Sequence, residues 1–219
     1  PFTGKSVSAL LDGQIHEPPP KLAALASSGT FVPAKLEAIY ERALAKDPTE
    51  RFASVGEFAA ALLDVDLQGT TQVVVDIRSR FLFETEVFAR RQRRTLGIGE
   101  LNELMLQAQA DAYGDGLLQS TAHPYMWALK PHYYSSHFYN WPYTYGLLFG
   151  LGLFAQYQQD PQRFSAHYDD ALSRAGMNTA EELGRVFGFD VTDGAFWTAS
   201  LDVIRQRIAG YEALVAEVV

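Results

Sequence analysis

Apolar residues recur every three or four positions along most of this 219-residue chain. No segment sustains the strict alternation of apolar and polar residues that is typical of a half-buried β-strand. Because 47% of the residues are apolar and 20% are charged, the chain has enough apolar surface to form a packed core. The sequence therefore predicts a globular, all-α fold.

The composition changes at residues 67–71, Leu-Gln-Gly-Thr-Thr. Before this point, short helical patterns are separated by proline and glycine; after it, the helices lengthen and aromatic residues become frequent. We therefore expect two pieces, residues 1–66 and 67–219. We also expect residues 73–219 to pack together, with residues 1–64 forming a separate small cluster.

The first piece contains three expected helices. Apolar residues at helical spacing mark residues 6–16 and 33–45, and Asp47-Pro48 should stop the second of these because the residue before proline avoids the α region. A third helix should begin after Ser54, which forms a capping-box pattern with Glu57 three residues later.

The second piece should be helical nearly throughout, over residues 73–91, 100–113, 161–175, 179–187 and 196–218. Gly114 should end one of these helices, Thr179 and Glu182 form a capping box, and Asp193 is a suitable cap for the last helix. The helix over 73–91 has apolar residues at helical intervals and charged residues between them: Val73, Ile77, Phe81 and Phe88, with Asp76, Arg78, Arg80, Glu84 and Glu86 between.

Charge and composition argue against several classes of partner. The net charge of −8 argues against nucleic acid, and the one basic run, residues 90–94, is best interpreted as the solvated end of a helix. The most apolar stretch, residues 143–154, is too short to span a bilayer, so we expect no membrane. The absence of cysteine and of a signal-peptide pattern favours a cytoplasmic location.

Residues 123–149 hold three of the five histidines and ten aromatic residues. Two prolines, at 131 and 142, and two serines, at 135 and 136, predict a loop between helices in the middle of this segment. Tyrosine hydroxyls and imidazole N–H groups can stabilise an oxyanion as a carbonyl becomes tetrahedral. The alternative is that the aromatic residues are core residues. Taken singly, His123, His137 and His167 are more typical of hydrogen-bonded structural histidines.

The first piece resembles the end of a bacterial Ser/Thr protein kinase over roughly residues 1–64. The resemblance is carried by Pro1-Phe2-Thr3-Gly4, by Ile15 and the prolines at 18–20, by residues 42–52 (Arg-Ala-Leu-Ala-Lys-Asp-Pro-Thr-Glu-Arg-Phe) and by Glu57-Phe58. It implies the last three helices of the kinase C-lobe, in which the arginine at the position of Arg51 pairs with a glutamate of the activation segment. That glutamate, the glycine-rich loop, the ATP-binding lysine and the H-R-D and D-F-G motifs are missing.

The second piece, about residues 68–219, resembles oligoendopeptidase F and its relatives in the thimet oligopeptidase family. The matching segments are residues 100–105, 112–115, 123–128, 132–146, 150–157, 187–190 and 196–197. The resemblance implies the helical C-terminal portion of a zinc peptidase that cuts short peptides. It places the family's substrate-binding and oxyanion histidine on His132, and its tyrosines on Tyr139 and Tyr143, with Tyr145 as the competitor to Tyr143 and itself a candidate for substrate binding. His123 and Tyr134 are further candidates for substrate binding.

The zinc site of that family is missing from this sequence. The family holds zinc with H-E-x-x-H and a later glutamate, both upstream of the matching region. The one His-Glu pair here, His16-Glu17, is followed by Pro18-Pro19-Pro20, which prevents the helical turn that such a site needs. We therefore expect no metal in this chain, zinc only in a complete family enzyme, and no activity from the chain alone.

The sequence leads to one functional hypothesis with two alternatives. The chain is interpreted as the substrate-binding, oxyanion-side part of a zinc metalloendopeptidase, with short peptides and the missing zinc-bearing half as its partners. The alternatives are a non-catalytic peptide-binding or interaction module and a kinase-derived fusion remnant.

Overall fold

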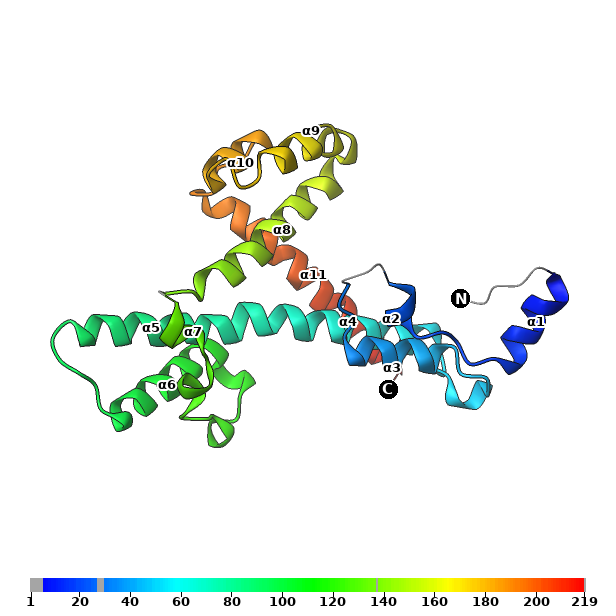
Figure 1. Ribbon diagram of the computed structural model, residues 1–219, viewed down its shortest axis with the longest axis horizontal. Helices are drawn as coiled ribbons and strands as arrows, with labels where there is room; N and C mark the ends of the chain where they lie inside the picture. Colours follow the sequence, from blue (N-terminus) through cyan, green and yellow to red (C-terminus); the bar gives the residue numbers. More distant parts are fainter. Residues whose placement is uncertain (1–5, 27–29, 137, 219) are drawn as a thin grey trace. The chain divides into compact units, whose positions relative to one another are not determined.

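The computed structural model describes residues 6–26, 30–136 and 138–218, and within these ranges every regular element is helical and no strand occurs (Figure 1). The predicted all-α class is confirmed. No helix in the described ranges is long and apolar enough to cross a membrane. The chain divides into two compact units, one formed by the residues up to Gln68 together with those from Gln206 onward, and the other by Gly69–Arg205.

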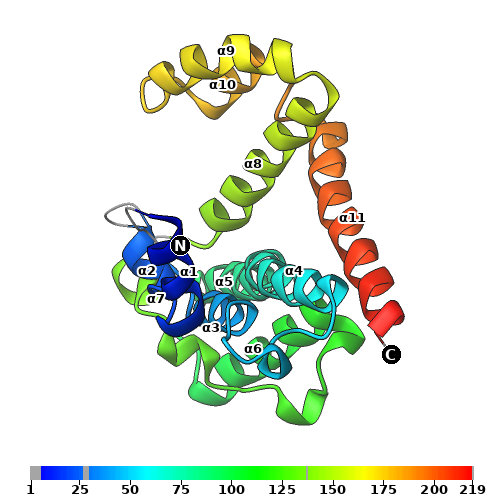
Figure 2. The same ribbon diagram turned by 90° about the vertical axis from the view of Figure 1, so that its right-hand side faces the viewer.

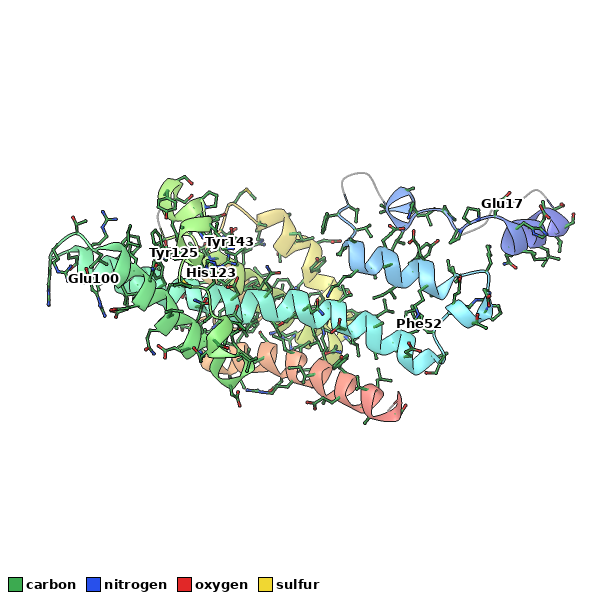
Figure 3. The ribbon with its side chains drawn as sticks, turned by 90° about the horizontal axis from the view of Figure 1, so that it is seen from below. Glu17, Phe52, Glu100, His123, Tyr125 and Tyr143 are labelled. Carbon is green, nitrogen blue, oxygen red and sulfur yellow. The ribbon has the colours of Figure 1, made fainter. Side chains whose placement is uncertain are left out.

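The first unit is built from short helices: α1 (Val7–His16), α2 (Leu22–Leu25), α3 (Ala34–Ala43), the 3-10 turn η1 (Pro48–Glu50) and most of α4 (Val55–Thr71). The predicted cap of α4 is confirmed, because the Glu57 backbone N–H donates to Ser54 Oγ at 3.0 Å. The Glu57 carboxylate in turn accepts from the Ala53 N–H at 2.7 Å. Phe52, at the entry to this helix, is labelled in Figure 3. Residues 1–4 of the kinase-like pattern lie outside the described residues.

The last turns of α11 (Gly194–Val218) belong to the first unit. Arg207 pairs with Asp66 of α4 at 2.9 Å, and Tyr211 lines a small cavity with Phe52 and Ala60. The contacts therefore group residues 206–219 with the first unit, whereas the sequence had assigned them to the second piece. Helix α11 contributes its residues up to Arg205 to the second unit and its last turns to the first.

The second unit begins with a helical hairpin. The end of α4 continues through a π-helical turn, η2 (Gln72–Asp76), into α5 (Ile77–Arg91), and α6 (Ile98–Tyr113) packs back along α5 (Figure 1). The core of this hairpin contains Phe83, Leu96, Leu104, Met105 and Ala108. The inward face of α6 therefore includes Leu104, Met105 and Ala108, and Gly114, with φ +56°, ends that helix as expected.

The apolar pattern of α5 is only partly buried, because Ile77 lies in the core whereas Phe81 and Phe88 do not. Phe81 and Phe88 are 37% and 45% exposed. Their rings pack on the ring of Phe138, at 5.0 and 5.8 Å between ring centroids. Glu84 is instead buried, and the side chain of Arg80 is largely covered. Charged residues can take core positions when hydrogen bonds and opposite charges compensate their lost hydration, and both of these have such partners.

The rest of the second unit follows α6 in order. Three 3-10 turns, η3 (Gly114–Gly116), η4 (Gln119–Thr121) and η5 (Met126–Leu129), lead to α7 (His132–Ser135), α8 (Trp141–Gln159), α9 (Pro161–Arg174), α10 (Ala180–Val186) and α11. Helices α9 and α10 lie side by side (Figure 2). The capping box of Thr179 and Glu182 is confirmed in both directions, at 2.7 and 3.2 Å. Asp193 accepts from the Ala195 N–H at 2.9 Å, which confirms it as the cap of α11.

Helix α8 packs on the first half of α11 through a tight aromatic contact. Leu151 is buried against Val203 and Ile204. The rings of Phe189 and Phe196 stack at 3.9 Å between centroids, and Phe196 lies directly over Gly152. A glycine is needed at this position because the aromatic ring occupies the space of a side chain.

Gly152→Ala is expected to lower the free energy of unfolding by about 2 kcal/mol, because overpacking a core displaces its neighbours. The new Cβ would overlap the Phe196 ring and lie 2.7 Å from Ser200 Oγ. Gly150→Ala, two residues earlier in α8, is the control: its Cβ meets nothing within 4 Å, so the gain in helix propensity should raise stability by about 1 kcal/mol. Urea unfolding of both variants measures this, and equal effects would contradict the packing account.

Candidate functional site

A chain of hydrogen bonds links α5 to α7. The Nε2 atom of His132 lies 3.0 Å from Oδ1 of Asn140, and Nδ2 of Asn140 donates to the carboxylate of Glu84. Asn140 is fully buried, only 4% of Glu84 is exposed, and His132 is half-buried. The imidazole is therefore held from behind by two buried polar side chains.

The end of η2 and the first half of α5 carry a ladder of charges that is largely covered. Asp76, Arg80 and Glu84 are spaced four residues apart, so they lie above one another on the helix. Asp76 and Arg80 form an ion pair, and Ser79 Oγ donates to the Asp76 carbonyl at 2.7 Å. Asp76 ends the π-helical turn η2, and such turns often occur at functional sites.

Burial raises the pKa of three groups in or near the ladder, Glu84, Tyr133 and Tyr113. Burial raises the pKa of Glu84 above its ordinary value, and the Asn140 hydrogen bond and the nearby His132 oppose that shift. Burial also raises the pKa of Tyr133 well above its usual range, and its hydroxyl forms no hydrogen bond of normal geometry within the described residues. Burial, reinforced by the Asp76 carboxylate, raises the pKa of Tyr113 to about 12.

Tyr143 lies near His132, and Tyr139 packs against Tyr143. Tyr139 and Tyr143 are 49% and 43% exposed, and their rings meet edge to face at 5.8 Å between centroids. The Tyr143 ring centroid is 6.5 Å from that of His132. We call His132, Tyr139 and Tyr143 the His/Tyr cluster. Its members are half-buried or exposed, and His132 contacts the buried Asn140.

The backbone turns sharply just before Tyr139. Phe138 has φ +50°, a left-handed conformation that residues other than glycine seldom adopt, and its ring is held by Phe81 and Phe88. Such conformations persist where the surrounding packing fixes them, and they concentrate at functional sites. His137, the preceding residue, lies outside the described residues.

Tyr145 lies apart from the cluster. Its ring packs against Trp141, Phe149 and Trp197, and its hydroxyl is buried with no hydrogen-bond partner in the described part of the chain. Burial raises its pKa. Residues two apart on a helix point in nearly opposite directions, so Tyr143 and Tyr145 of α8 cannot serve the same surface.

His123 and Tyr134 are also outside the cluster. Gln109 brackets the backbone of His123, accepting from its N–H at 3.3 Å and donating to its carbonyl at 3.1 Å, and His123 Nδ1 accepts from the Tyr125 N–H at 3.2 Å. Figure 3 labels His123 and Tyr125 in the segment after α6, and Tyr143 near the start of α8. Tyr134 is 66% exposed, donates to the Trp127 carbonyl at 3.3 Å and lines a cavity of about 270 Å³.

Comparison with models of protein families, with curated proteins and with solved structures finds no match to this chain. The resemblance to the oligopeptidases and kinases therefore rests on the sequence segments quoted above.

A zinc site of the oligopeptidase type does not fit the side chains that the structure brings together. In the described ranges, no group of three or more His, Asp or Glu side chains could hold a metal ion. His16 lies at the exposed end of α1 beside Asp12, at 3.8 Å. In the second unit, the amide of Asn140 lies between His132 and Glu84, so these two do not form a shared ligand set.

Sequence reasoning did not single out Glu84 or Asn140. The signal for Glu84 was present in the four-residue spacing of Asp76, Arg80 and Glu84, which puts charges of alternating sign on one helical face. Asn140 gave no comparable signal, because a single amide in an aromatic loop is ordinary turn chemistry.

Proposed function

We propose that the second unit is the substrate-binding, oxyanion-side part of a metalloendopeptidase acting on short peptides. We further propose that this chain by itself binds such peptides without cutting them. The observation that carries the proposal is the His/Tyr cluster: two exposed tyrosines next to a histidine that is backed by buried Asn140 and Glu84.

The chemistry of the cluster suits a peptide backbone. Phenol hydroxyls donate to carbonyl oxygens, and they bind more strongly as negative charge develops on that oxygen in a tetrahedral intermediate. Hydrolysis also needs an activated water. The sequence lacks H-E-x-x-H and the described residues bring no equivalent ligands together, so the cluster alone should bind a peptide and leave it intact.

The kinase-like reading of the first unit is the weaker alternative. The Arg51 guanidinium donates to the carbonyls of Ala45 and Lys46, at 2.7 and 3.3 Å, and so ties down its own loop. Arg42 pairs with Glu57 at 2.7 Å and lies 4.1 Å from the centre of the Phe52 ring. These contacts support a structural role for the residues that carry the resemblance.

The full chain should bind short unblocked peptides in calorimetric titration, with no cleavage products by mass spectrometry and no stoichiometric zinc after purification. Tyr139→Phe should weaken binding about fivefold, because a hydrogen bond to a ligand contributes about 1 kcal/mol. Tyr168→Phe removes a comparably exposed hydroxyl from α9 and should leave binding unchanged. Chelator-sensitive hydrolysis by the chain, or equal losses in both variants, would contradict the proposal.

A further inference from the structure

The direction of each hydrogen bond behind His132 is set by chemistry. An ionised carboxylate only accepts hydrogen bonds, so the side of Asn140 that faces Glu84 must be its NH₂ group. The amide oxygen of Asn140 then faces His132 Nε2 at 3.0 Å, and this nitrogen must donate. We propose that Glu84 and Asn140 are positioning residues that hold His132 with a proton on Nε2.

Burial makes this orientation hard to reverse. Asn140 is fully buried, and turning its amide over would point the carbonyl oxygen at the Glu84 carboxylate while leaving both groups without a donor. An unsatisfied buried polar group costs about 1–3 kcal/mol, and more when the group is charged. A single orientation of Asn140 therefore dominates, and with it a single tautomer of His132.

The tautomer determines what His132 can do for a ligand. With the proton on Nε2, the Nδ1 atom of the neutral ring is a hydrogen-bond acceptor, and it forms no hydrogen bond within the described residues. It is therefore suited to a peptide N–H. A peptide carbonyl is left to the hydroxyls of Tyr139 and Tyr143, whose rings contact each other beside His132.

This division of roles rests on the proposed peptide binding, whereas the tautomer itself does not. The protonation of the ring is a property of the free chain, so it can be measured without any peptide. It also changes the expectation for His132, which as a neutral ring accepts from the ligand instead of donating to an oxyanion.

Long-range ¹H–¹⁵N spectra of the full, ¹⁵N-labelled chain test the proposal, recorded at a pH of about 8.5, where an ordinary imidazole is neutral. His132→Gln assigns the His132 signals by their loss. We expect one protonated and one bare ring nitrogen, with the proton on Nε2. A wild-type spectrum with the proton on Nδ1, or with an even mixture, overturns the proposal whatever the variants do.

Glu84→Gln tests the link from the carboxylate to the ring. A glutamine amide can either donate or accept, so Asn140 is no longer forced into one orientation and the two tautomers of His132 should mix. Glu86→Gln is the control, because Glu86 lies two residues on in α5, is half exposed and pairs with Arg90. An unchanged tautomer in folded Glu84→Gln would show that Glu84 is not a positioning residue.

Titration with a short unblocked peptide separates the two proposals. We expect the bare Nδ1 signal to shift on binding while the Nε2 signal stays protonated. If the free chain shows the Nε2–H form but no peptide changes Nδ1, the positioning role stands and the proposed peptide binding fails. If the free chain shows the Nδ1–H form, the positioning role fails independently of any binding.

Discussion

Asn140→Leu is expected to lower the free energy of unfolding by about 3 kcal/mol at neutral pH. Leucine has the same branched heavy-atom skeleton as asparagine, so the change replaces polar atoms with methyl groups and leaves no void. It leaves the buried Glu84 carboxylate without its donor and His132 Nε2 without its acceptor. Urea unfolding of the full chain, followed by circular dichroism, measures the loss.

Two further measurements separate a broken network from general damage to packing. The double variant Glu84→Leu with Asn140→Leu should recover most of the loss, because removing both partners of a buried pair is far less costly than removing one. The deficit of Asn140→Leu should also shrink as the pH falls below neutral, because the Glu84 carboxyl, whose pKa burial already raises, then takes up a proton. A double variant as unstable as the single one would contradict the account.

The local features of the fold could be predicted because their causes lie within a few residues. The capping box of Thr179 and Glu182 and the glycine that ends α6 depend on side-chain reach and backbone freedom that the sequence displays directly. The buried face of α5 could not be predicted in the same way. Whether Glu84 points inward depends on Asn140, which lies 56 residues further along the chain.

The candidate site shows the same limit. The density of tyrosine and histidine in residues 123–149 indicated where polar donors gather, but it could not separate Tyr143 from Tyr145. Their separation depends on where α8 begins: with both residues inside that helix, one ring meets Tyr139 and the other packs against Trp197. A loop in place of the helix would have allowed both to face one ligand.

Tyr133→Phe should protect the chain against alkaline unfolding. Burial raises the pKa of Tyr133 well above 10 in the folded state, whereas the unfolded chain ionises tyrosine near 10. Above that pH the folded state therefore holds one proton more than the unfolded state, and the free energy of unfolding falls by about 1.4 kcal/mol per pH unit for this residue. The stability that the protonated Tyr133 side chain contributes is fully present below pH 10. It is lost as the pH rises toward the folded-state pKa.

The phenylalanine variant has no hydroxyl at this position and therefore no group that can ionise. Because the Tyr133 hydroxyl has no hydrogen bond of normal geometry in the described residues, its loss should leave stability nearly unchanged or slightly higher at pH 8. The free energy of unfolding of the variant should then rise relative to that of the wild type by about 1.4 kcal/mol for each pH unit above 10. Urea unfolding across that range measures the difference. Tyr168→Phe, an exposed tyrosine of α9, should run parallel to the wild type. A constant difference between Tyr133→Phe and the wild type across the range would mean that Tyr133 ionises in the folded state as easily as in the unfolded one.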